Sequence, residues 1–212
     1  LMKKNIYFFE IEDVLTNQAK LPYRTGLIWS YCLEHKKIKD NFNLDGWYWY
    51  RDKDNTVENI FKKIRNPKLV AFSCFVWNWN WNMQMAKKIK KKWPKCIILI
   101  GGWQPPISDR SQGFFKKYKY IDIISHGEGE ITVKEILLEI LKTKKDWTKI
   151  KGCSMPFRML NKKTNIKNNV IDNNFKKIDE KHVSNPGKYE TYTTEPRPRI
   201  DHLALMPSPY LN

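Results

Sequence analysis

The chain has 212 residues and a formal net charge of +17, from 39 basic and 22 acidic side chains. This length suits one ordinary domain with an extension, since domains commonly contain about 100–200 residues, and it allows a core that buries roughly 70% of the unfolded surface. The sequence contains no apolar run of about 18 residues, which argues against a membrane span or a signal peptide, so we expect a cytoplasmic protein with no membrane partner.

Short hydrophobic runs alternate with longer amphipathic stretches about five times along the first two thirds of the chain. This alternation is typical of a parallel sheet covered by helices on both faces. The strand candidates are residues 5–10, 46–50, 68–75, 96–100 and 120–125, and the helix candidates are residues 23–36, 56–64, 80–93, 111–117 and 131–143. We therefore predict an α/β fold of the flavodoxin-like (Rossmann-like) type, with a doubly wound, five-stranded parallel sheet.

The pattern changes after about residue 145. Two short strand-like runs, 150–160 and 165–171, flank a polar turn and predict a hairpin. The following segment is rich in proline, which favours extended backbone and predicts a strap or linker. We therefore expect one α/β domain over residues 1–145, followed over residues 146–212 by a hairpin and a linker to a further domain absent from this chain.

Two features of the composition limit the possible chemistry. The four cysteines lie far apart with no C-x-x-C pair, which indicates reduced, buried thiols and provides no ligand set for zinc or an iron–sulfur cluster. The positive charge is the kind that nucleic acids attract. However, the lysines are spread along the chain among asparagines, a pattern typical of solvated helix faces, so nucleic-acid binding is the less favoured interpretation.

The residues that follow the predicted strands are the candidates for a binding site, because doubly wound sheets bind ligands beyond the carboxyl ends of their strands. These candidates are Ser73, Cys74, Phe75 and Trp77 after the third strand, Gly101, Gly102 and Trp103 after the fourth, and His126, Gly127, Glu128 and Gly129 after the fifth. Paired glycines let backbone approach a ligand closely and permit positive φ, although a tight turn without any ligand has the same pattern.

Occurring together at successive strand ends, these motifs resemble the cobalamin (vitamin B12)-binding N-terminal domain of radical S-adenosylmethionine enzymes. That family has a serine-containing turn after its third strand and Gly-Gly after its fourth, which Ser73 to Phe75 and Gly101-Gly102 match. Residues 122–130 are similar to the family's glycine–glutamate turn, and residues 197–210 resemble the strap that leads into its barrel.

The resemblance implies a cobalamin-binding module of methyltransferase type that is not catalytic by itself. Its partner would be a C-terminal radical barrel outside this chain, and that barrel would carry S-adenosylmethionine and a 4Fe-4S cluster.

One motif departs from those of related cobalamin domains. Cobalamin domains of the mutase and methyltransferase type carry Asp-x-His-x-x-Gly after the first strand, and residues 21–26 match it only at Gly26. Tyr23 is no substitute for the imidazole, because a phenol with a pKa of about 10 is a poor cobalt ligand. We therefore expect the corrinoid to be held without a protein histidine on cobalt. Two alternatives stay open: a cofactor-free structural or substrate-recognition module of the same architecture, and a basic nucleic-acid-binding protein.

Overall fold

The computed structural model describes residues 2–12, 22–50, 56–107, 110–160, 190–201 and 206–209, without the side chains of residues 47–50. In chain order the elements are β1 (Lys4–Glu12), α1 (Tyr23–Leu33), α2 (Lys36–Asn41), β2 (Phe42–Tyr50), α3 (Val57–Lys63), β3 (Pro67–Cys74), α4 (Trp79–Lys92), β4 (Ile97–Gly102), α5 (Phe114–Lys117), β5 (Ile123–Ser125), α6 (Glu130–Leu141), the 3-10 helix η2 (Trp147–Lys149), β6 (Cys153–Pro156), the 3-10 helix η3 (Phe157–Met159) and β7 (Thr191–Thr193).

These strands form one sheet with the order β2-β1-β3-β4-β5-β6-β7. The first five strands in this order are parallel and have the strand order of a flavodoxin-like fold, which confirms the predicted fold class. The predicted strand number was wrong, because β6 pairs antiparallel with β5, and β7 pairs antiparallel with β6. The sheet is therefore mixed and has seven strands.

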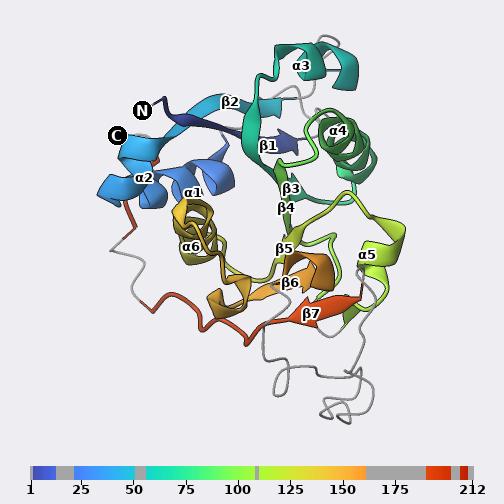
Figure 1. Ribbon diagram of the computed structural model, residues 1–212. Helices are drawn as coiled ribbons and strands as arrows, with labels where there is room; N and C mark the ends of the chain where they lie inside the picture. The colour runs from blue at the N-terminus through green and yellow to red at the C-terminus, as the bar shows by residue number, and fades with distance from the viewer. Residues whose placement is uncertain are drawn as a thin grey trace.

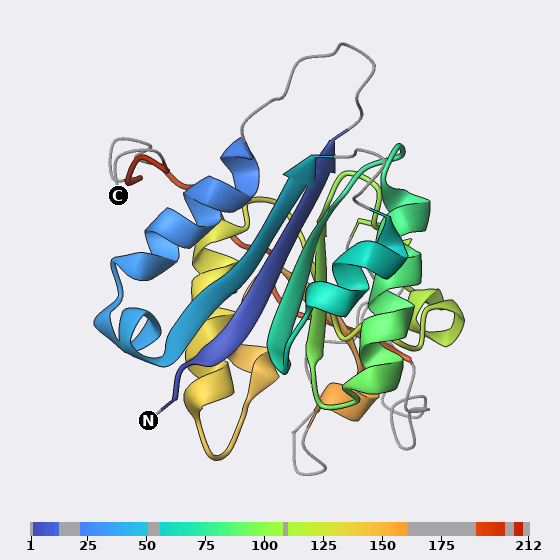
Figure 2. The same cartoon turned by 90° about the horizontal axis from the view of Figure 1, so that it is seen from above.

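Helices cover both faces of the sheet, with α1, α2 and α6 on one side and α3, α4 and α5 on the other (Figures 1 and 2). Successive residues of β1 serve the two faces in turn, because side chains alternate across a strand. Ile6 and Phe8 are buried in the core under α1, α2 and α6, whereas Tyr7 and Phe9 are buried in the core under α3, α4 and α5. Because a core packs against each face of the sheet, the central strands β3 and β4 are mostly apolar on both faces.

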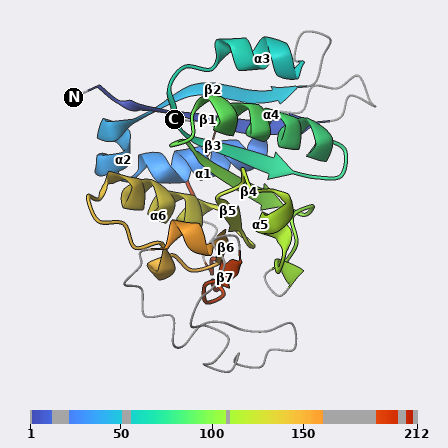
Figure 3. The same cartoon turned by 45° about the vertical axis from the view of Figure 1, so that its right-hand side comes forward.

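The two antiparallel strands lie at one edge of the sheet, beyond β5 (Figure 3). The first arm of the predicted hairpin contains β6, whereas the second, residues 165–171, lies outside the described residues. Among the described residues, the strands that pair with β6 are β5 and β7. β7 lies in the segment interpreted as a strap, and Thr191 and Tyr192 are buried. Part of the proline-rich segment is therefore a strand of the sheet.

The described part of the chain includes no helix long and apolar enough to cross a membrane. It also includes no cluster of three or more histidine, cysteine or acidic residues that could hold a metal ion. All four cysteines are buried and free of disulfide bonds, in agreement with the interpretation of their spacing.

Candidate functional site

A cleft of about 260 Å³ opens at the carboxyl ends of the parallel strands, on the face that α1 and α6 cover. It is lined by the first turns of these two helices and by the turns that follow β3, β4 and β5. Eight of the twelve residues predicted from the sequence line it: Ser73, Phe75, Gly101, Gly102, Trp103, Gly127, Glu128 and Gly129. The three predicted strand-end motifs thus meet in one place, as the parallel arrangement requires.

The two glycines after β4 have different structural roles. Gly102 has a φ of +97°, and a Cβ there would lie 2.5 Å from the carbonyl oxygen of Cys74. The close packing of two strands therefore requires Gly102. At Gly101 a Cβ would meet the Ser125 carbonyl oxygen at 3.7 Å, which is an ordinary contact, so the fold tolerates a side chain there. Gly101 is thus the better candidate for close approach to a ligand.

The other four predicted residues do not line the cleft. Gly26 is buried within α1, and Trp77 stacks on Phe75 beside the cleft at a ring-centroid distance of 4.7 Å. Cys74 packs in the core under α4, because it alternates across β3 with the cleft-lining Ser73. The His126 Nε2 atom lies 2.7 Å from the Ser154 Oγ atom and so ties β5 to β6.

Sequence reasoning missed the wall of the cleft that α1 provides, together with the last residue of β5 and the first residue of α6. The missed polar and aromatic residues are Tyr23, Arg24, Thr25, Ser125 and Glu130. Ser125 carried a usable signal, because it ends β5 as Ser73 nearly ends β3. The α1 residues carried none, since their placement depends on the packing of α1 against α6.

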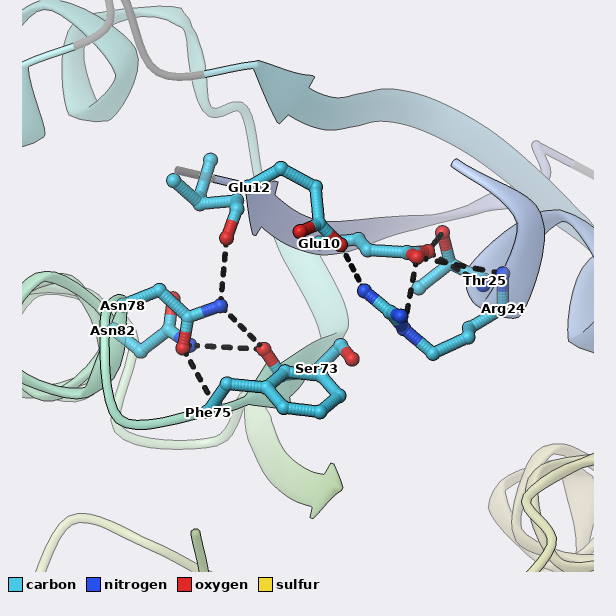
Figure 4. Close-up of polar contacts among 9 residues, drawn as sticks. Glu10, Glu12, Arg24, Thr25, Ser73, Phe75, Asn78 and Asn82 are labelled. Atoms are coloured by element: carbon cyan, nitrogen blue, oxygen red, sulfur yellow. Dashed lines mark hydrogen bonds and ion pairs between the residues drawn. The ribbon is translucent and has the colours of Figure 1, made fainter. Parts of the chain in front are cut away.

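The start of α1 is held by a buried carboxylate rather than open to an anion. Glu10, which is 2% exposed, accepts hydrogen bonds from the Thr25 backbone nitrogen at 2.7 Å and the Thr25 hydroxyl at 2.6 Å (Figure 4). Arg24 forms ion pairs with Glu10 and Glu12, and its guanidinium lies 4.5 Å from the centre of the Phe75 ring. Because the helix N-terminus and the arginine already have anionic partners, this wall favours a neutral ligand group.

Buried asparagines fasten the turn that follows β3 (Figure 4). The Asn78 side chain donates to the carbonyl oxygens of Ile11, at 2.7 Å, and Ser73, at 3.0 Å, while its own oxygen accepts from the Phe75 backbone nitrogen at 2.8 Å. Asn82 donates to the same Ser73 carbonyl at 3.2 Å. These bonds hold Ser73 and Phe75 rigidly at the cleft.

Trp79 and Trp81, which follow the turn after β3, pack against other aromatic side chains and do not line the cleft. Trp79 contacts Phe114 and Tyr118, and Trp81 contacts Phe9 of β1. Trp79 and Trp81 therefore contribute to packing rather than to the surface of the cleft.

Two residues that line the cleft carry a buried oxygen with no hydrogen-bond partner among the described residues, namely the Ser125 hydroxyl and one Glu130 carboxyl oxygen. Burial, together with the nearby Glu128 carboxylate, raises the pKa of Glu130 above its ordinary value. A buried polar atom without a partner costs about 1–3 kcal/mol. The Ser125 hydroxyl can donate or accept a hydrogen bond and the Glu130 oxygen can accept one, so these two groups fit a ligand that carries amide or hydroxyl groups.

The sequence is similar to two curated methyltransferases. One is the cobalamin-dependent radical SAM methyltransferase TokK of Streptomyces tokunonensis, 31% identical over 152 residues. The other is the 2-(S-pantetheinyl)-carbapenam-3-carboxylate methyltransferase of Streptantibioticus cattleyicolor, 29% identical over 152 residues. Each alignment covers 72% of this chain but 21% of the relative, so the chain spans about a fifth of the length of these relatives. No protein-family model matches the chain.

The fold is similar to that of a solved structure, the cobalamin-dependent S-adenosylmethionine radical enzyme OxsB with aqua-cobalamin bound. The TM-score is 0.58 at 16% identity, and the match covers 92% of this chain and 23% of that chain. The sequence matches and this structural match agree with the resemblance drawn from the strand-end motifs. The chain is therefore similar in sequence to part of a cobalamin-dependent radical SAM methyltransferase and in fold to part of a cobalamin-dependent S-adenosylmethionine radical enzyme.

Proposed function

We propose that this chain is a cobalamin-binding module of a methyltransferase-type radical S-adenosylmethionine enzyme. The observation that carries the proposal is the meeting of all three strand-end motifs in one cleft, in a chain whose curated relatives include a cobalamin-dependent methyltransferase. Ser73, Gly101 and Gly102 would contact the cofactor from the β3 and β4 side. Gly127, Glu128 and Gly129 would close the adjoining edge.

The size of the cleft limits which part of the cofactor it takes. Pockets that enclose a drug-sized ligand measure about 300–1,000 Å³, and cobalamin is larger than such ligands. A cleft of about 260 Å³ therefore holds only part of it. Around the cleft, Tyr23 is 54% exposed and Trp103 is 90% exposed. Aromatic side chains so exposed are typical of a binding surface, and they would cover the part of the cofactor that stays outside.

The polar groups of the cleft fit the same cofactor. Cobalamin carries many neutral amide side chains, which match the unpaired oxygens of Ser125 and Glu130. Among the described residues of the α1 wall that line the cleft, the one cation is Arg24, and it is paired with Glu10 and Glu12. When bound, cobalamin would supply methyl-transfer chemistry, while this chain positions it and excludes water from its buried part.

We further propose that no histidine of this chain ligates cobalt. Among the described residues that line the cleft there is no histidine, and the His126 ring is engaged with Ser154 at 2.7 Å. Electron paramagnetic resonance of the Co(II) state would test this in protein made with 15N-labelled histidine. We expect spectra identical to those of unlabelled protein, and a changed hyperfine splitting would contradict the proposal.

We propose that the other cofactors of such an enzyme are bound outside this chain. S-adenosylmethionine and a 4Fe-4S cluster would belong to a C-terminal radical barrel domain, which the residues after β7 would join to the module. The greater length of the curated relatives supports a further domain of this kind. Because β6 and β7 extend the sheet of the first domain, we propose that the module includes them and ends after β7.

Titration with hydroxocobalamin, followed by visible absorbance, tests the function. We expect the wild-type chain to bind, and Ser73→Phe to abolish binding because the new ring fills the cleft. Gln84→Phe is the matched control, since Gln84 is exposed on α4, which covers the other face of the sheet. A folded wild-type chain that does not bind would overturn the proposal in favour of a cofactor-free module.

A further inference from the structure

Residues 194–200, which follow β7, lie against the domain. We call residues 194–200 the strap. Its first part continues the pairing of β7, because the Thr194 nitrogen donates to the Cys153 carbonyl oxygen at 2.9 Å. Next, the Gly152 nitrogen donates to the Glu195 carbonyl oxygen at 2.7 Å. The strap is therefore docked on the chain segment that connects η2 to β6.

Arg197 anchors the middle of the strap to α6. Its side chain is 11% exposed, and its Nε atom donates to the Thr132 hydroxyl at 3.0 Å. The guanidinium also forms an ion pair with Glu135, one turn further along α6. Arginine presents several donors in a fixed planar arrangement, so these bonds define one position. Pro196 and Pro198 restrict the backbone on both sides of Arg197, which further narrows its conformations.

The end of the strap reaches the edge of the cleft. The Ile200 backbone nitrogen donates to a carboxylate oxygen of Glu128 at 2.7 Å. Glu128 lines the cleft and lies between Gly127, with a φ of +71°, and Gly129. A turn with two glycines has more backbone freedom than other turns. The strap amide supplies a partner that holds Glu128 in place.

We propose that Arg197 is a positioning residue for the cleft: by anchoring the strap on α6, it places the Ile200 amide where it fixes Glu128 and the turn of residues 127–129. The part that concerns the ligand rests on the proposed function. Since coupling between two sites is reciprocal, a ligand that prefers the ordered turn also holds the strap more firmly. The strap would thus link cleft occupancy to the position of the chain that follows it.

The first test uses the ligand-free protein and measures amide hydrogen exchange. In Arg197→Ala we expect exchange to rise about tenfold at Ile200 and at the amides of residues 127–129, because their mutual anchor is lost. Arg158→Ala is the matched control. Arg158 is also a partly buried arginine with an ion pair, but its partner Asp122 precedes β5 and lies at the opposite end of that strand from the cleft. We expect Arg158→Ala to leave the rate of hydrogen exchange at these amides unchanged.

The second test measures affinity for hydroxocobalamin. We expect Arg197→Ala to bind about 5- to 10-fold more weakly than wild type, in the range typical of coupled sites, with partial rescue in Arg197→Lys and no change in Arg158→Ala. Glu128→Gln is a second variant in case Arg197→Ala does not fold, because a neutral amide is a weaker acceptor for the Ile200 nitrogen. It should raise exchange at Ile200 in the same way.

The outcomes separate this inference from the proposed function. Unchanged exchange at Ile200 and at residues 127–129 in ligand-free Arg197→Ala would overturn the positioning role, whatever the chain binds. Raised exchange with unchanged cobalamin affinity would overturn the coupling to the ligand. If the wild-type chain binds no cobalamin, the proposed function fails, while exchange at residues 127–129 still decides whether Arg197 orders the cleft.

Discussion

At the scale of single residues, the two positive-φ glycines at the cleft differ in what surrounds them. Gly102 has a φ of +97° and faces the Cys74 carbonyl oxygen. Gly127 has a φ of +71°, and no atom lies within 4 Å of the position that a Cβ would take there. Any L-residue at either position bears the strain of left-handed backbone. Only at Gly102 does the new methyl group also collide with a neighbouring strand. Backbone strain and steric collision can therefore be separated with one pair of variants.

We expect Gly102→Ala to lower the free energy of unfolding by about 3 kcal/mol or more, from strain plus overpacking. Gly127→Ala should lower it by only about 1 kcal/mol, from strain alone. Urea unfolding followed by tryptophan fluorescence measures both values. Equal losses in the two variants would show that the backbone around Gly102 relaxes away from Cys74, and would contradict this account.

At the scale of elements, the sequence predicted the five parallel strands and the main helices that follow them, but it missed α2 and β7. The five parallel strands and the main helices have clear hydrophobic patterns, and α4 begins at Trp79, within one residue of its predicted start. β7 has three residues, Thr191 to Thr193, too few to show a period. Its burial depends on pairing with β6, which no local pattern encodes.

The site residues that could be predicted lie at or just after the ends of strands. Strand ends can be located from hydrophobic runs, so Ser73 near the end of β3, Gly101 near the end of β4 and Gly127 in the turn after β5 were found. Arg24 and Glu130 line the cleft because α1 and α6 lie beside each other over the sheet. That contact joins residues about 100 positions apart, and only the folded chain shows it.

A buried charge cluster joins several elements at the end of β5 opposite the cleft. Asp122, which is 1% exposed, accepts from Lys90 of α4 at 2.7 Å, from the Ile98 nitrogen of β4 at 2.8 Å and from Arg158 of η3 at 2.7 Å. Removing one member of a buried ion pair costs about 3–5 kcal/mol. Lys90 and Arg158 are 20% and 22% exposed, so water can partly solvate them once Asp122 is gone.

We therefore expect Asp122→Ala to destabilise the fold by about 3 kcal/mol, at the lower end of that range. Asp40→Ala is the control, because Asp40 is 53% exposed and its partner Lys36 is 89% exposed. An exposed pair of this kind contributes less than about 0.5 kcal/mol. Chemical denaturation at neutral pH measures both variants, and a loss below about 1 kcal/mol in Asp122→Ala would show that the cluster does not hold these elements together.

At the scale of the whole molecule, the four buried thiols report on whether the two faces of the sheet unfold together. Cys32 and Cys153 lie in the core under α1, α2 and α6, and Cys74 and Cys96 lie in the core under α3, α4 and α5. Burial raises the pKa of Cys74, Cys96 and Cys153 to about 12 and raises that of Cys32 as well. Because the thiolate is the reactive form, native thiols react slowly at pH 8.

Since both cores share one sheet, we expect a single cooperative transition, in which all four thiols become reactive together as urea rises. Labelling with a thiol reagent at pH 8, read by peptide mass spectrometry, gives the rate at each cysteine. The four rates should depend on urea with the same slope, and fully denatured protein, in which all four thiols react freely, sets the upper limit. Different slopes for the pair Cys32 and Cys153 and the pair Cys74 and Cys96 would mean that each helical layer opens separately, which would make the sheet a boundary between two units.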